Sequence, residues 1–193
     1  SVGNGGFSIN DGTYDPVGPG GSQAPLAGAY CVVSDPDGPG HHVLYQDIGV
    51  PGMATVATLR WAHRLHNHSG VYTEKQQFRM EIRDLNNQVL AIAFATSPGD
   101  PMETPWIQRN YDLTGFRGRG LRLAFVVENQ LDYFNVLIDN VSVTVESSPP
   151  TWYEVYFGSN LPLIPGALQG TTTNQYWELP PLWPLTSYYW GVI

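Results

Sequence analysis

The stretch that decides the fold is residues 77–84, where polar and apolar side chains alternate without a break: Gln77-Phe78-Arg79-Met80-Glu81-Ile82-Arg83-Asp84. A period of two places Phe78, Met80 and Ile82 on one face of an extended chain, and the charged side chains on the other. This alternation is typical of a β-strand that has one face against a core and the other in water. We therefore predict a strand over 77–84.

Similar segments recur on both sides of this stretch, separated by turn signals rich in Gly, Pro, Asn and Asp. They cover residues 27–33, 42–48, 54–66, 89–96, 106–113, 121–129 and 135–145, and a short strand is expected near 6–9. No segment carries a helical apolar stripe of useful length. Short strands at this spacing predict an all-β sandwich or barrel.

Composition narrows the class of protein further. The chain has 193 residues, of which 42% are hydrophobic, so a core can form. The net charge of −8 argues against a nucleic-acid partner. No run of about 18 apolar residues is present, so we expect no membrane span. Low lysine content, abundant Gly, Pro, Thr and Asn, and 12% aromatic residues fit an extracellular β protein.

The single cysteine bears on disulfide formation, and the first residue bears on processing. Cys31 lies in an apolar run, where we expect a buried thiol, and one cysteine excludes an internal disulfide. Ser1 is preceded by no initiator Met and no signal peptide, so we expect a processed or excised piece.

A linker over 147–150, Ser147-Ser148-Pro149-Pro150, divides the chain. We expect a domain over 1–146 and a smaller segment over 151–193, with strands over 152–158, 175–179 and 187–192. The segment is too short for a sandwich with its own full core. Its dense aromatic residues predict an interaction surface; they are Trp152, Tyr153, Trp177, Trp183, Tyr188 and Tyr189.

Four motifs in the first domain resemble the jelly-roll modules of the galactose-binding-like kind, which include carbohydrate-binding modules and MAM-like adhesion domains. The first two motifs are Asn4-Gly5-Gly6-Phe7, and Gly28–Asp37 followed by His42-Val43-Leu44-Tyr45-Gln46-Asp47. The other two are Phe78-Arg79-Met80-Glu81-Ile82-Arg83-Asp84 and Phe134-Asn135-Val136-Leu137-Ile138-Asp139-Asn140-Val141. The resemblance implies a jelly-roll β-sandwich, a glycan or cell-surface ligand, and often a structural calcium ion. Residues 151–193 resemble the later strands of a fibronectin type III domain whose early strands and last strand are missing.

Calcium takes about 6–8 oxygen ligands. For the ion that the resemblance implies, Asp139 is the first candidate, with Asp35 and Asp37 as partners and Asp11 and Asp15 as further donors. Ser8 stands where such modules commonly carry an acidic residue. The alternative is that Asp139 caps a strand end and that Asp35 and Asp37 are turn residues bonded to their own backbone.

A glycan site calls for rings that stack on sugars and for planar polar groups. Trp106, Tyr111 and Tyr133 lie near strand ends, and Arg79 and Arg83 lie on a polar strand face, so these five are the predicted ligand-binding residues. Arg60 and Arg64 lie on another polar face. The alternative for all four arginines is a solvated face with cross-strand Arg–Glu pairs.

No catalytic motif is present, neither Gly-x-Ser-x-Gly nor His-Glu-x-x-His, and Glu81 among arginines is expected to stay ionised. We therefore expect a non-catalytic extracellular binding or adhesion module. The alternative is a structural subunit of a filament or surface layer, a homo-oligomer in which strands of a neighbouring subunit complete the C-terminal segment.

Overall fold

The computed structural model describes residues 5–16, 21–36, 38–148, 152–163, 165–174 and 176–193. The chain divides into two compact units, Ser1–Ser147 and Ser148–Ile193. The helical segments among the described residues are two 3-10 turns of three residues, η1 (Thr114–Phe116) and η2 (Pro165–Ala167). Neither is long or apolar enough to cross a bilayer.

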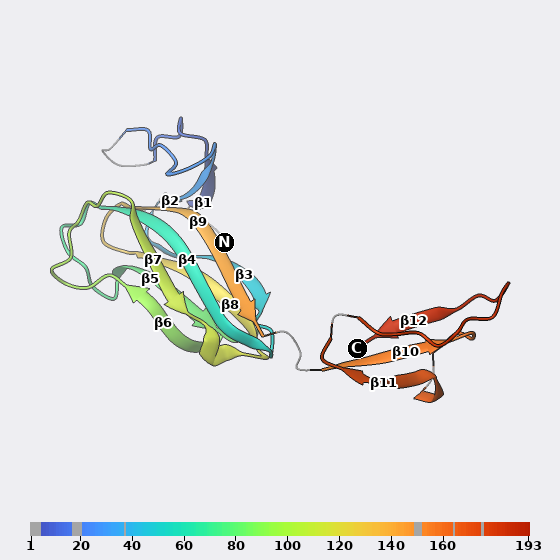
Figure 1. Ribbon diagram of the computed structural model, residues 1–193. Coiled ribbons are helices and arrows are strands. Elements are labelled where there is room, and N and C mark those ends of the chain that lie inside the picture. The colour runs from blue at the N-terminus through green and yellow to red at the C-terminus, as the bar shows by residue number, and fades with distance from the viewer. Residues whose placement is uncertain (1–4, 17–20, 37, 149–151, 164, 175) are drawn as a thin grey trace. The chain divides into compact units, whose positions relative to one another are not determined.

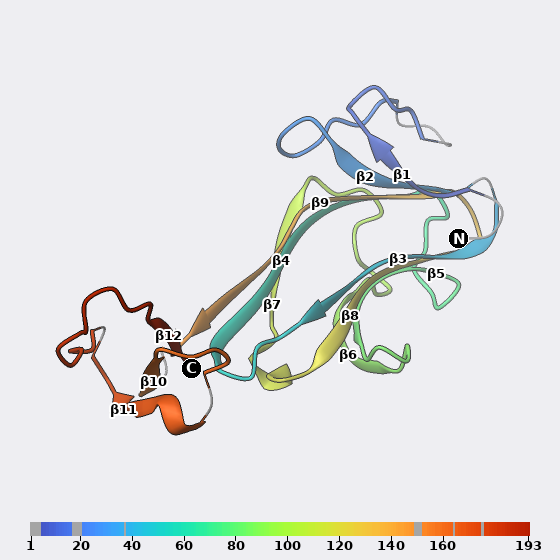
Figure 2. The ribbon, with the colours of Figure 1, turned by 90° about the vertical axis from the view of Figure 1, so that its right-hand side faces the viewer.

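The first unit is a sandwich of two antiparallel sheets, seen as two layers in Figure 2. The five-stranded sheet has the order β1 (Gly5–Asn10), β2 (Cys31–Pro36), β9 (Phe134–Ser147), β4 (Ala54–Asn67), β7 (Ile107–Asp112). The four-stranded sheet has the order β3 (Gly40–Gly49), β8 (Gly120–Asn129), β5 (Gln76–Arg83), β6 (Val89–Ala95). The chain passes repeatedly from one sheet to the other (Figure 1). The first unit is therefore an all-β sandwich, as predicted.

The core lies between the two sheets and follows from the alternation in the sequence. Phe78, Met80 and Ile82 of β5 are fully buried, as predicted. They share one cluster with Trp61 and Leu59 of β4. Each large apolar side chain buried in this way contributes roughly 1.5–3 kcal/mol, so the unit is held together by its inward-facing residues.

The first expected strand, over 27–33, lies further along the chain as β2, from Cys31 to Pro36. The reason is local: Gly28 has a φ of +65°, a left-handed conformation that interrupts extended backbone. The residues before β2 therefore form a loop.

The second unit contains one sheet with the order β11 (Leu168–Thr172), β10 (Tyr153–Gly158), β12 (Tyr189–Val192). The strand expected over 175–179 is not formed by 176–179, and residue 175 lies outside the described residues. β10 has only two edges to pair, and β11 and β12 occupy both of them.

Candidate functional site

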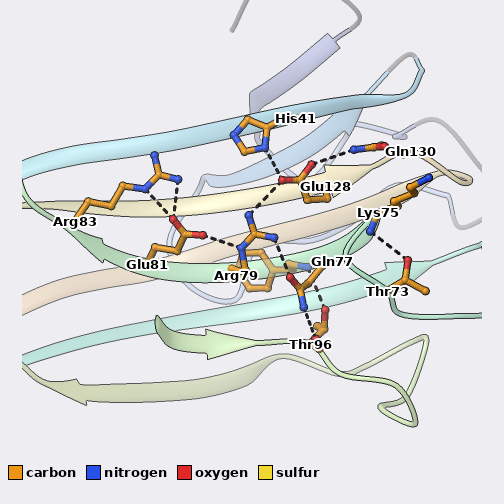
Figure 3. A network of polar contacts seen from close by, with 11 residues as sticks. His41, Thr73, Lys75, Gln77, Arg79, Glu81, Arg83, Thr96, Glu128 and Gln130 are labelled. Carbon is orange, nitrogen blue, oxygen red and sulfur yellow. Dashed lines mark hydrogen bonds and ion pairs between the residues drawn. The ribbon is translucent and has the colours of Figure 1, made fainter. Parts of the chain in front are cut away.

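Arg79 and Arg83, two of the predicted ligand-binding residues, lie on the outer face of the four-stranded sheet with Glu81 between them (Figure 3). Arg79 Nε lies 2.7 Å from Glu81 Oε1, and Arg83 Nη2 lies 2.7 Å from Glu81 Oε2. Arg79 Nη2 is also 3.2 Å from Glu128 Oε1, which lies 2.6 Å from His41 Nδ1. The structure therefore places both guanidinium groups in ion pairs with neighbouring carboxylates.

These pairs also fix the charge of Glu81, which is only 4% exposed. Burial alone would raise its pKa, but the hydrogen bonds and the positive charges of Arg79 and Arg83 together outweigh burial and hold the pKa below its ordinary value. A carboxylate held ionised in this way is a poor proton donor. Glu81 thus fits a structural role on this face better than general acid catalysis.

The three predicted aromatic residues occupy three different places. Tyr111 packs against the core cluster between the sheets. Tyr133 is exposed beside His68, with ring centroids 6.3 Å apart. Trp106 packs against a separate cluster that contains Leu137 of β9. Since Val136 and Ile138 point into the core, Leu137 and Trp106 lie on the outer face of the five-stranded sheet.

That outer face carries a hollow of about 290 Å³ that the predictions did not single out. Its floor is Ala62 of β4, which is fully buried. Exposed polar side chains surround this small residue; they are Arg60, Gln108, Asn110, Asn140 and Ser142. We call this hollow the polar pocket.

Strand register explains how residues far apart in sequence meet in the polar pocket. Arg60 pairs with Asn110 of β7 on one side and with Ser142 of β9 on the other. Ala62 pairs with Gln108 on the same side as Asn110. Residues paired across antiparallel strands have their Cβ atoms about 4.5–5.5 Å apart and share one face. The pocket is thus lined by two neighbouring sets of paired residues, one that contains Arg60 and one that contains Ala62.

An irregularity in β9 brings in Asn140. Between Arg60 and Ala62 the register with β9 shifts, because three steps from Ser142 to Asp139 oppose two steps on β4. Asn140 lies in this bulge with a φ of +52°, a conformation that asparagine tolerates better than most residues. Bulges of this kind re-aim side chains and are frequent beside binding sites.

The five polar side chains of the pocket share one further property. Among the described residues, none of them has a hydrogen-bond or ion-pair partner for its side chain. This contrasts with the Arg79–Glu81–Arg83 network, whose charged groups are all engaged. The polar pocket therefore offers amide, guanidinium and hydroxyl groups that are free to bind a ligand.

Asp139, the first candidate for calcium, has its carboxylate directed at backbone amides. Its Oδ2 accepts hydrogen bonds from the N–H groups of Leu26 at 2.9 Å and Ala27 at 3.1 Å, and its Oδ1 accepts one from Asn140 at 2.6 Å. Oxygens aimed at N–H donors are not aimed at a cation. This geometry fits a carboxylate that fastens the loop before β2 onto β9.

The other predicted calcium ligands do not join Asp139. Ile138 pairs with Val32, so Asp139 lies across from Cys31, four residues or about 13 Å from Asp35. Asp35 accepts a hydrogen bond from the Tyr14 hydroxyl, and Asp37 lies outside the described residues. Within the described ranges, no three His, Cys, Asp or Glu side chains form a group that could hold a metal. Calcium binding stays a prediction of the resemblance.

The predicted aromatic surface belongs to the second unit. Trp177, Tyr153 and Trp190 line a hollow of about 500 Å³ on its sheet, together with Val155 and Val192. Tyr188 stacks on Phe157 with ring centroids 5.1 Å apart. Trp152, Trp183 and Tyr189 are exposed. Two of the six predicted residues thus line one apolar hollow.

Comparison with known proteins shows similarity only to solved structures. No family model matches the chain, and no curated protein matches it. The K3 cleaved adhesin domain of Lys-gingipain from Porphyromonas gingivalis is 17% identical with a TM-score of 0.45, covering 72% of this chain and 90% of that one. The K1 cleaved adhesin domain of the same protein is 12% identical with a TM-score of 0.45, covering 75% and 85%. A CBM4 structure is 18% identical with a TM-score of 0.37, covering 72% and 94%.

Proposed function

We propose that the first unit is a non-catalytic extracellular module that binds a glycan through the polar pocket. The observation that carries this proposal is the set of five polar side chains without partners around the buried Ala62. Planar amides and a guanidinium group both match the hydroxyl groups of a sugar, because each presents hydrogen-bonding groups in fixed directions. The ligand would be held in a shallow hollow on a rigid sheet.

The partly buried Trp106 lies close to this pocket. It precedes Gln108 by two residues and lies on the same face of the sheet, where it packs against Leu137. An indole ring at the rim adds an apolar surface for the C–H face of a sugar. Of the five predicted ligand-binding residues, Trp106 is the one that this proposal retains.

The lining of the pocket favours binding without turnover. Hydrolysis of a glycosidic bond ordinarily uses two carboxyl groups about 5–10 Å apart. The described residues that line the pocket include no Asp or Glu, and the carboxylate of the neighbouring Asp139 accepts hydrogen bonds from backbone amides. The module would therefore hold its glycan and leave it intact, as an adhesion or targeting domain does.

A panel of oligosaccharides and the full chain test this function. We expect wild-type protein to bind at least one member, and Asn110→Ala to weaken that binding about tenfold, the effect of one lost hydrogen bond to a ligand. Asn86→Ala removes a comparable amide from an exposed turn outside the pocket and should leave affinity unchanged. Calorimetry that detects no binding to any glycan would refute the proposal.

A further inference from the structure

The charges around the polar pocket differ from those of the chain as a whole. The protein has 17 acidic residues and 9 basic ones. Among the residues that line the pocket, Arg60 has its side chain on the outer face, whereas Arg109 pairs with the core-facing Trp61 and lies over the Phe94 ring. As far as the structure describes it, the lining contains no carboxylate. In a chain with this excess of acidic groups, the outward-facing charge of the pocket lining is the guanidinium of Arg60.

Four of the seven other arginines form ion pairs with carboxylates of the protein. Arg64, Arg79, Arg83 and Arg122 each lie within 3.6 Å of a carboxylate oxygen. Arg117 and Arg119, in the exposed loop before β8, have no carboxylate partner among the described residues. Arg60 has no such partner among the described residues, although it is exposed on the same kind of strand face as Arg79. Arg109 lies over the Phe94 ring at 4.5 Å, and its Nε is buried without a hydrogen-bond acceptor.

Two carboxylates flank the pocket in the ladder, and both accept hydrogen bonds from backbone amides. Asp139 pairs with Ala62 in the ladder, but its oxygens accept bonds from the amides of Leu26, Ala27 and Asn140. Asp112 lies two positions beyond Asn110 on β7, and its Oδ1 accepts a bond from the Thr114 amide. Neither is within ion-pair distance of Arg60.

Given the proposed function, on which this inference rests, we infer that the glycan is acidic and that Arg60 binds a carboxylate on the sugar. A guanidinium group matches a carboxylate through two parallel N–H donors, which gives both strength and orientation. Asn110 and Ser142, on either side of Arg60 in the ladder, would then contact hydroxyl groups of the same saccharide. The ligand class is a saccharide that carries a carboxylate, and uronic-acid oligosaccharides are its probes.

A paired panel tests this assignment on the full chain. Each uronic-acid oligosaccharide is compared with its methyl ester, which keeps the ring and removes the charge. We expect the acid to bind at least tenfold more tightly than the ester in low salt, and the difference to shrink as salt rises. Arg60→Gln should lower affinity for the acid about tenfold or more and change affinity for the ester little.

Two variants control for folding and for net charge. Arg117→Gln removes the same charge from an exposed arginine outside the pocket and should leave both affinities unchanged. Arg60→Lys keeps the charge without the fork and should retain part of the preference, and a thermal melt verifies that each variant is folded. Equal binding of acids and esters, or an Arg60→Gln variant with wild-type affinity for the acid, would overturn the inference and leave the proposed function standing. Failure of every glycan to bind would overturn both.

Discussion

At the scale of single residues, His63 shows how the core controls an ionisable group. Its ring lies between Phe78 and Phe94, with centroids 5.2 Å and 4.7 Å away, and its Nδ1 accepts a hydrogen bond from Trp61 Nε1 at 3.1 Å. Burial, with a smaller contribution from the nearby positive charge of Arg109, lowers the pKa of His63 to about 3. The imidazole is therefore neutral in the folded protein at ordinary pH.

This neutral histidine makes stability depend on pH. Between its unfolded pKa near 6.5 and its folded pKa near 3, the unfolded chain binds a proton that the folded chain does not. The free energy of unfolding should therefore fall as pH falls, by about 1.4 kcal/mol per unit across that window for this one group. Urea melts at pH 4 to 7 measure the slope. His63→Gln, which keeps an acceptor for Trp61, should flatten it. A His63→Gln slope equal to that of the wild type would contradict the assignment.

Residue types also show where sequence reasoning succeeds. Parity along 54–66 placed Leu59, Trp61 and Leu65 on one apolar face, and all three are buried. The same parity placed Arg60 on a polar face with Arg64, yet it could not reveal that Arg64 has a carboxylate partner whereas Arg60 has none within the described part of the chain. Pairing between side chains depends on which strands are neighbours, and one strand's sequence does not contain that information.

At the scale of elements, β9 combines pairing, loop attachment and the pocket in one strand. Its bulge at Asn140 contributes to the pocket, and the preceding Asp139 holds the loop before β2. Ile138-Asp139-Asn140-Val141 ends one of the motifs that carry the resemblance, and the sequence predicted a strand over 135–145. The bulge itself depends on register with β4, so Gln108 and Asn140 could not be placed together from sequence alone.

Replacing Asp139 separates a hydrogen-bonding role from a calcium-binding role. Asp139→Ala removes the acceptor for three backbone amides and should cost about 1–3 kcal/mol of stability. Because hydrogen bonds carry the effect, the loss of melting temperature should be equal in calcium and in EDTA. Glu146→Ala, an exposed position further along β9, is the control and should have no effect. A loss seen only with calcium present would show that Asp139 is a metal ligand.

At the scale of the whole molecule, the second unit has an open apolar face on its three-stranded sheet. Among its described strands, β11 and β12 each pair only with β10, so their outer edges are free to accept another strand. Trp190, 75% exposed, lines the hollow on this sheet. Unpaired edges beside exposed apolar side chains favour strand addition, and we propose that the added strand comes from a second copy of the chain.

Light scattering after size-exclusion chromatography tests this assembly. We expect the wild-type chain to form oligomers whose mass rises with protein concentration, and Trp190→Glu to dissociate them by placing a charge in the apolar hollow. Trp183→Glu changes an equally exposed tryptophan outside the hollow and should preserve the oligomers. A monomeric wild-type chain of 21.3 kDa at high concentration would contradict self-association.

The most direct test of glycan binding at the polar pocket is a map of amide chemical shifts as an oligosaccharide from the panel is added to the labelled full chain. The account predicts that the largest changes fall on Arg60, Ala62, Gln108, Asn110 and Ser142, the residues that line the pocket. Amides around Arg79, Glu81 and Arg83 should move little, because that face is already paired. Changes centred on the Arg79 face or beside Tyr133, or no changes at saturating glycan, would contradict it.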